Sequence, residues 1–136
     1  MLFNITITKD ILQQTAECGL PMYRRPIDTN CPFAVAIMHL IPFVSIDGKY
    51  MWFYLGDIPK DTESADPTKI VRERVTSKQR MFIRKFDRLM SAAKRMDLPE
   101  ETFLVNIPDE VIRYYYPNDR FMEILKDSKV IKLPNN

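Results

Sequence analysis

The feature that most constrains this chain is an apolar run after a Cys-Pro pair, in the stretch NCPFAVAIMHL at residues 30–40. Proline is favoured at the first position of a helix, because its missing N–H would be unpaired there in any case. The residue before a proline avoids helical dihedral angles, as an N-cap residue does. Cys31 is therefore the expected N-cap and Pro32 the first helical residue. Residues 33–38 leave this helix no polar face, so we expect it to be buried at the centre of the fold.

The rest of the chain predicts strands and helices without regular alternation, which indicates an α+β fold. Periodicity and β-forming residues predict strands at 2–8, 43–55, 69–75, 102–107 and 129–133. Further helices are predicted at 8–19, 77–95, 108–116 and 118–127, and loops at 20–30 and 56–68. We expect a small mixed sheet with a β-hairpin, packed against the buried central helix and a long basic amphipathic helix.

The length of 136 residues suits one domain over 1–136. We expect its core at about 2–107 and a C-terminal helical extension at 108–136.

The hairpin at 43–55 is predicted from Asp47-Gly48, a sequence typical of a two-residue turn. Such a turn places Ile46 opposite Lys49. Both faces of the hairpin are largely apolar, so either both are covered or one is an adhesive surface. This alternative leaves room for a homodimer.

Composition excludes several classes of function. Only three glycines are present, and no phosphate-binding loop or dinucleotide fingerprint occurs, so no cofactor is expected. No apolar run approaches the roughly 20 residues of a membrane span, and the N-terminus does not have the pattern of a signal peptide. We therefore expect a cytoplasmic protein, located in a host cell or a virion, without membrane contact.

Cys31 is the candidate nucleophile of an enzyme, because a helix N-terminus lowers the pKa of a thiol. Its general base would have to be near, and His39 lies about 12 Å further along the same helix. Cys18, Cys31 and His39 are also fewer soft ligands than the four of a structural zinc site, so no metal is expected. A buried cysteine N-cap is the preferred interpretation, and a cysteine-dependent enzyme is the least favoured one.

The basic residues are concentrated between Lys69 and Arg95, where ten Lys or Arg stand against two acids. The predicted helix at 77–95 carries a basic side and an apolar stripe. The basic side consists of Arg80, Arg84, Arg88 and Arg95, flanked by Lys94. The apolar stripe consists of Phe82, Phe86, Leu89 and Ala93. Arginine suits phosphate and carboxylate contacts, so the basic side can bind an acidic protein, follow a nucleic-acid backbone, or simply be solvated.

Three consecutive tyrosines, Tyr114, Tyr115 and Tyr116, lie between arginines near the C-terminus. A helix spreads them over about 200°, so they cannot all be buried on one side. Tyrosine and arginine are enriched at interface hot spots, and tyrosine rings can stack on bases. The alternative is one or two rings in the core and the third on an ordinary surface.

The order of these motifs resembles a group of short proteins from phages and bacterial genomes. Those proteins start with a strand of the type I-x-V-T, continue with a helix that opens with Cys-Pro, and contain a later helix with F-I-x-x-F-D. The corresponding segments here are ITITKDI at 5–11, CPFAVAI at 31–37 and MFIRKFD at 81–87. The resemblance covers residues 2–107 and implies a phage or mobile-element origin, with Cys31-Pro32 as a feature of the fold.

These observations favour a small non-enzymatic accessory protein that docks on a virion or host protein through its basic face. The expected partner is an acidic protein surface. Direct nucleic-acid binding through the arginines of 77–95 is the second hypothesis.

Overall fold

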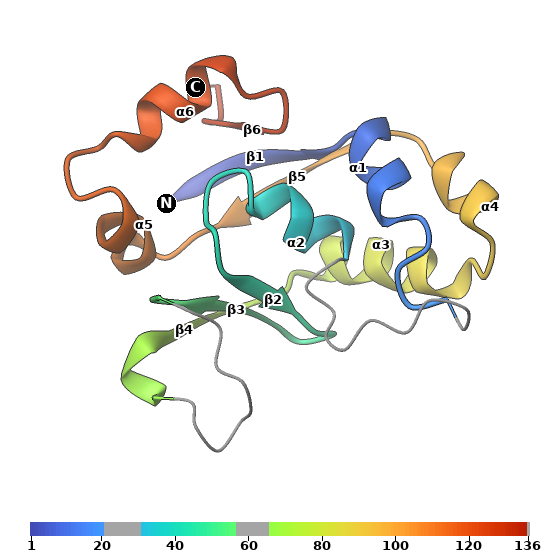
Figure 1. The fold of residues 1–136 in the computed structure, drawn as a ribbon, viewed down its shortest axis with the longest axis horizontal. Coiled ribbons are helices and arrows are strands. Elements are labelled where there is room, and N and C mark those ends of the chain that lie inside the picture. The colour runs from blue at the N-terminus through green and yellow to red at the C-terminus, as the bar shows by residue number, and fades with distance from the viewer. Residues whose placement is uncertain (21–30, 57–65, 136) are drawn as a thin grey trace.

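The computed structural model describes residues 1–20, 31–56 and 66–135 (Figure 1). The elements in chain order are β1 (Leu2–Ile7), α1 (Lys9–Thr15), α2 (Pro32–Ile37), β2 (Val44–Ile46), β3 (Tyr50–Tyr54), the short 3-10 helix η1 (Pro67–Lys69), β4 (Ile70–Arg74), α3 (Ser77–Arg88), α4 (Ala92–Met96), β5 (Glu101–Asn106), α5 (Asp109–Tyr115), α6 (Phe121–Asp127) and β6 (Ile131–Lys132). The α+β class is confirmed. Most of the two loops predicted at 20–30 and 56–68 lies outside the described residues.

The strands form two antiparallel sheets of three strands, with the orders β5-β1-β6 and β2-β3-β4. The sequence predicted one small mixed sheet. In the first sheet, β1 is the central strand, and its alternate residues Phe3, Ile5 and Ile7 are fully buried. None of the helices in the described ranges has both the length and the apolar character needed to cross a bilayer.

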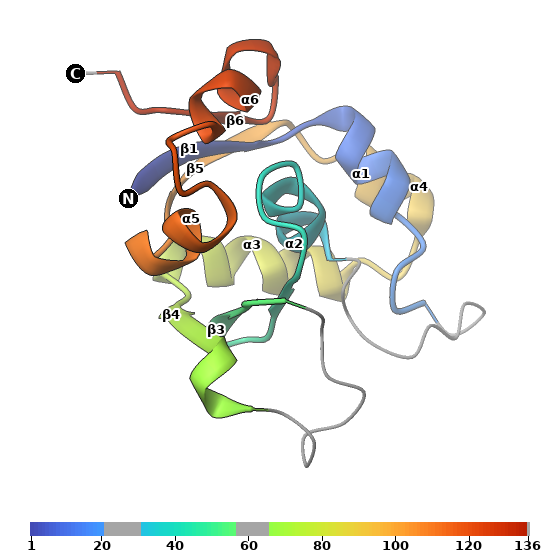
Figure 2. The same cartoon turned by 60° about the vertical axis from the view of Figure 1, so that its left-hand side comes forward.

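Helix α2 lies between the two sheets, as Figures 1 and 2 show from two directions. Its start is as predicted, with Pro32 in the first turn and the Cys31 sulfur accepting a hydrogen bond from the Ala34 N–H at 3.3 Å. The Phe33 ring contacts the ring of Phe82 from α3 and the ring of Phe103 from β5, with centroids 5.6 and 4.7 Å away. The expected central burial of this helix is confirmed.

The β2-β3 hairpin turns later than predicted, because the turn follows Asp47 instead of starting with it. Ile46 pairs with Met51 and not with Lys49. The Asp47 carboxylate accepts hydrogen bonds from the backbone N–H groups of Lys49 (2.7 Å) and Tyr50 (2.8 Å), which stabilises this alternative turn. The pairing moves by two positions, so each side chain keeps its predicted face.

The long helix predicted at 77–95 is two helices, α3 and α4, which are separated at Leu89. Leu89 has extended dihedral angles, and the Ser91 hydroxyl then caps α4 by accepting from the Lys94 N–H at 3.4 Å. Because the helix axis changes direction here, Ala93 is exposed and does not continue the predicted apolar stripe. The start of α3 is a capping box formed by Thr76 and Gln79.

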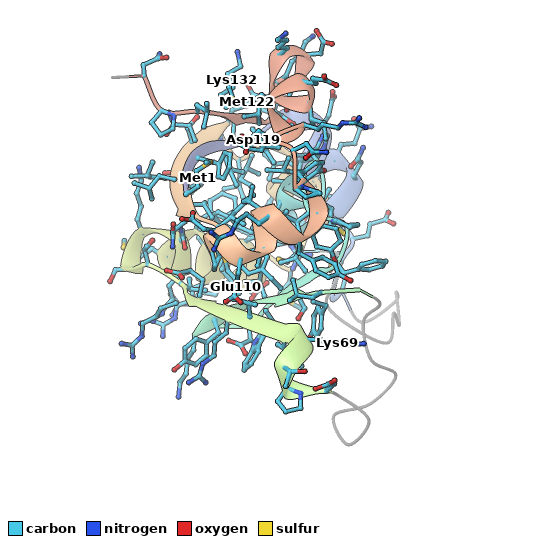
Figure 3. The ribbon with its side chains drawn as sticks, turned by 90° about the vertical axis from the view of Figure 1, so that its left-hand side faces the viewer. Met1, Lys69, Glu110, Asp119, Met122 and Lys132 are labelled. Atoms are coloured by element: carbon cyan, nitrogen blue, oxygen red, sulfur yellow. The ribbon has the colours of Figure 1, made fainter. Side chains whose placement is uncertain are left out.

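The C-terminal segment contributes to the same core as the rest of the chain. Strand β6 pairs with β1 and places the fully buried Ile131 opposite Ile5. The Phe121 ring of α6 contacts the Phe3 ring, with centroids 6.2 Å apart. Figure 3 shows this segment, marked by its side chain Lys132, at the end of the molecule opposite Lys69.

Replacing Ile131 by alanine is expected to lower the free energy of unfolding by about 2–4 kcal/mol, because it leaves a cavity beside β1. Lys132→Ala, on the exposed neighbour in the same strand, should change it by less than about 0.5 kcal/mol. Urea denaturation of both variants measures the difference. If both variants lower the free energy of unfolding equally, burial of Ile131 does not stabilise the core.

Candidate functional site

The basic face of α3 consists of Arg80, Arg84, Lys85 and Arg88. Arg84, Lys85 and Arg88 are exposed, and Arg80 is partly exposed. The acid of the same helix is Asp87, which is also exposed. Four cations against one acid leave this side of α3 with a net positive charge that a partner can contact.

Arg80 connects this basic face to the β2-β3 hairpin. Its Nε donates a hydrogen bond to the carbonyl oxygen of Gly48 at 3.1 Å. The next residue of the hairpin, Lys49, accepts a backbone hydrogen bond from Val75 at 2.8 Å, just before α3 begins. The start of α3 and the turn of the hairpin are thus held side by side.

Arg95 does not belong to the basic face, and its predicted place there is wrong. Only 2% of its surface is exposed, and its guanidinium stacks 4.2 Å from the centroid of the Phe86 ring. Nε donates to the carbonyls of Phe86 (3.1 Å) and Leu89 (2.8 Å), and Nη1 donates to those of Ala16 (3.0 Å) and Cys18 (2.6 Å). Arg95 therefore binds carbonyls at the ends of α3 and α1, where a cation is favoured.

Burial lowers the pKa of the Arg95 guanidinium below its ordinary value, while nearby Asp87 opposes this shift. The side chain stays charged at neutral pH, because the ordinary pKa of arginine lies far above neutrality. Its function is to position helices. Lys94, the adjacent candidate, is exposed and remains available to a partner.

Arg95→Met is expected to lower the free energy of unfolding by about 2–4 kcal/mol, because buried carbonyls of two helices lose their donors. Lys94→Met removes the same charge from an exposed position and is expected to change it by less than about 0.5 kcal/mol. Chemical denaturation compares the two. If both variants are equally stable, the guanidinium does not tie α1 to α3.

The three tyrosines differ in their surroundings. Tyr115 donates a hydrogen bond from its hydroxyl to the carbonyl of Tyr54 and accepts one from the Gly56 N–H at 3.0 Å. Tyr116 donates to the carbonyl of Leu40 at 2.5 Å, and burial raises the pKa of its phenol. These two side chains anchor α5, whereas Tyr114 is 53% exposed and can contact a partner.

The Cys31 thiol is poorly suited to nucleophilic catalysis. Burial raises its pKa from 9.0 to about 12, although the hydrogen bond from Ala34 acts in the opposite direction. His39 is exposed and lines a cavity of about 410 Å³ with Lys9, Glu100 and Lys129. In the described part of the chain, no group of three or more acidic, histidine or cysteine side chains is placed to hold a metal ion.

The raised pKa predicts that iodoacetamide alkylates Cys31 about 1,000-fold more slowly at pH 8 in the native protein than in the unfolded chain. Peptide mass spectrometry separates Cys31 from Cys18. The same shift stabilises the fold below pH 9, and this contribution is lost as the pH rises from 9 towards 12, because the unfolded chain then releases the proton more readily. Rapid native alkylation would restore Cys31 as a nucleophile.

A second surface, the outer face of the β2-β3-β4 sheet, is formed by Ser45, Tyr50, Trp52, Tyr54, Ile70, Arg72 and Arg74. The described α-helices lie on the opposite side of this sheet (Figures 1 and 2). The sequence left open whether both faces of the hairpin are covered or one of them is adhesive. The strand β4 was predicted, but its pairing with the hairpin was not, because a local sequence pattern does not show which strands are neighbours in space.

The chain matches no protein-family model, no curated protein and no solved structure.

Proposed function

We propose that this is a non-enzymatic binding protein of a phage or mobile element, which docks on an acidic surface of a virion or host protein. The contact uses the basic face of α3, with Lys94 and Tyr114 as further candidates. Arg95, Tyr115 and Tyr116 are left out, because their polar groups bind carbonyls of the protein itself. Binding would take place in the cytoplasm of the host or in the virion.

The observation that carries this proposal is the excess of positive charge on α3, where Arg80, Arg84, Lys85 and Arg88 stand against one acid, Asp87. Arg84, Lys85 and Arg88 are exposed on a helix whose opposite side, Phe82 and Phe86, is buried. A solvated helix face usually mixes charges of both signs more evenly than four cations against one acid. Such a face attracts acidic partners over a distance of about 10 Å and orients them before contact.

The second candidate is direct binding of nucleic acid by the same face. Arg80, Arg84 and Arg88 follow each other at single helical turns, which gives a row of cations about 6 Å apart along α3. A row of this kind can contact successive phosphates of a backbone.

Exchanging Arg84 and Arg88 for glutamate is expected to weaken binding of the acidic partner by at least about 100-fold, since attraction at two positions becomes repulsion. The partner is first isolated on immobilised protein from host or infected lysate after nuclease treatment. Purified partner is then titrated by calorimetry at low and high salt, and affinity should fall with salt.

The matched control is Lys126→Glu with Lys129→Glu, which makes the same change of charge at the end of the molecule that carries α6. This variant should bind almost as tightly as the unchanged protein. If both double variants weaken binding equally, the effect is one of net charge and the α3 face is not the contact. If nuclease treatment abolishes capture, nucleic acid is the partner.

A further inference from the structure

The outer face of the β2-β3-β4 sheet combines aromatic rings with cations in direct cross-strand pairs. Tyr50 lies opposite Arg74, and Trp52 lies opposite Arg72, on neighbouring strands. The side chains of opposite residues in an antiparallel sheet project from the same face. The rings are partly exposed and the arginines are exposed.

Contacts within the sheet hold the rings in place. The Trp52 indole donates its N–H to the Asp47 carboxylate at 2.8 Å, and its ring meets the Tyr50 ring edge-on at 5.6 Å. The Arg72 guanidinium lies 4.6 Å from the centroid of the Tyr50 ring. The rigid rings therefore lose little conformational entropy when a ligand stacks on them.

The charge of this face is positive. Its outward-facing side chains include two arginines and no acid, and its rim carries Lys49 and Arg80 at the hairpin turn and Lys69 before β4. The acids described at the rim are Asp47, which accepts from the Trp52 indole, and Asp66, which caps η1. A negatively charged ligand is therefore favoured over a neutral one.

We propose that the outer face of this sheet binds single-stranded nucleic acid, with bases stacked on Trp52 and Tyr50 and phosphates held by Arg72 and Arg74. Exposed aromatic side chains on a sheet, interleaved with cations, provide both contacts that such a ligand needs. This site does not depend on the α3 contact proposed above, and of the α3 cations Arg80 lies at its rim.

Other occupants suit the face less well. A second copy of the chain in a two-fold contact would bring the arginines of both copies together, and like charges repel. An acidic protein would pair with Arg72 and Arg74, but its carboxylates would meet the negative faces of the Tyr50 and Trp52 rings. A nucleobase presents a flat π-surface to those same rings.

The test uses the emission of Trp52, which is the single tryptophan of the chain. Titration of the full-length protein with short oligo(dT) at low salt is expected to quench this emission in a saturable manner. The apparent affinity should fall steeply as salt is added, because phosphate contacts release counterions. A duplex of the same length should quench little, because its bases are not free to stack on the rings.

Three variants separate stacking from charge, with affinities measured by the anisotropy of a labelled oligonucleotide. Tyr50→Phe keeps the ring and should keep the affinity, whereas Tyr50→Leu should weaken it by about 5- to 150-fold. Arg72→Ala with Arg74→Ala should weaken binding and reduce its salt dependence. Circular dichroism confirms that each variant is folded.

The α3 variant Arg84→Glu/Arg88→Glu should retain the saturable quench, so failure of the α3 proposal leaves this site intact. Absence of a quench in the folded protein would overturn the proposal, and so would equal quenching by the duplex. Equal affinities of Tyr50→Leu and Tyr50→Phe would exclude stacking. A quench by polyglutamate without one by oligo(dT) would assign the face to an acidic protein, and self-association that hides Trp52 would assign it to a second copy.

Discussion

Helix α2 has no polar face, so the fold has to cover it on every side. Two small sheets do this together, one from each side, with α3 and β5 supplying the Phe82 and Phe103 rings that meet Phe33. Neither sheet is large enough to form such a core alone, since a three-stranded sheet needs a packed face to be stable. The position of both sheets, and therefore of every surface they present, follows from the burial of this one short helix.

Around this apolar centre, the buried Arg95 and the exposed Lys9 bind carbonyls near the ends of helices. Arg95 binds carbonyls at the ends of α1 and α3, and Lys9 donates from Nζ to the carbonyls of Met96 (3.2 Å) and Leu98 (2.5 Å) near the end of α4. Carbonyl groups at helix C-termini carry partial negative charge, so positive charge is stabilised there. These two cations therefore complete the fold, whereas Arg84, Lys85 and Arg88 of α3 are exposed.

Local chemistry made much of the fold predictable. The Cys31 cap, the apolar α2 helix, the hairpin and the start of α3 all depend on contacts within a few residues along the chain. The errors came where a local preference competed with another contact. The predicted hairpin pairing was wrong because the Asp47 carboxylate accepts hydrogen bonds from the backbone of the turn. The predicted position of Ala93 in the apolar stripe was wrong because a new helix, capped by Ser91, begins before it.

Some features of the candidate surfaces were likewise predictable from the sequence, and others were not. The sequence by itself determined where along the chain the positive charge is concentrated. It also determined that both faces of the hairpin carry apolar side chains. Only the tertiary structure decided that Arg95 is buried, since its guanidinium meets carbonyls 77 and 79 positions away in the chain. It also placed β4 beside β3 and set the arginines opposite the rings. Burial and strand pairing depend on which distant segments share the core, and no pattern of neighbouring residues contains that information.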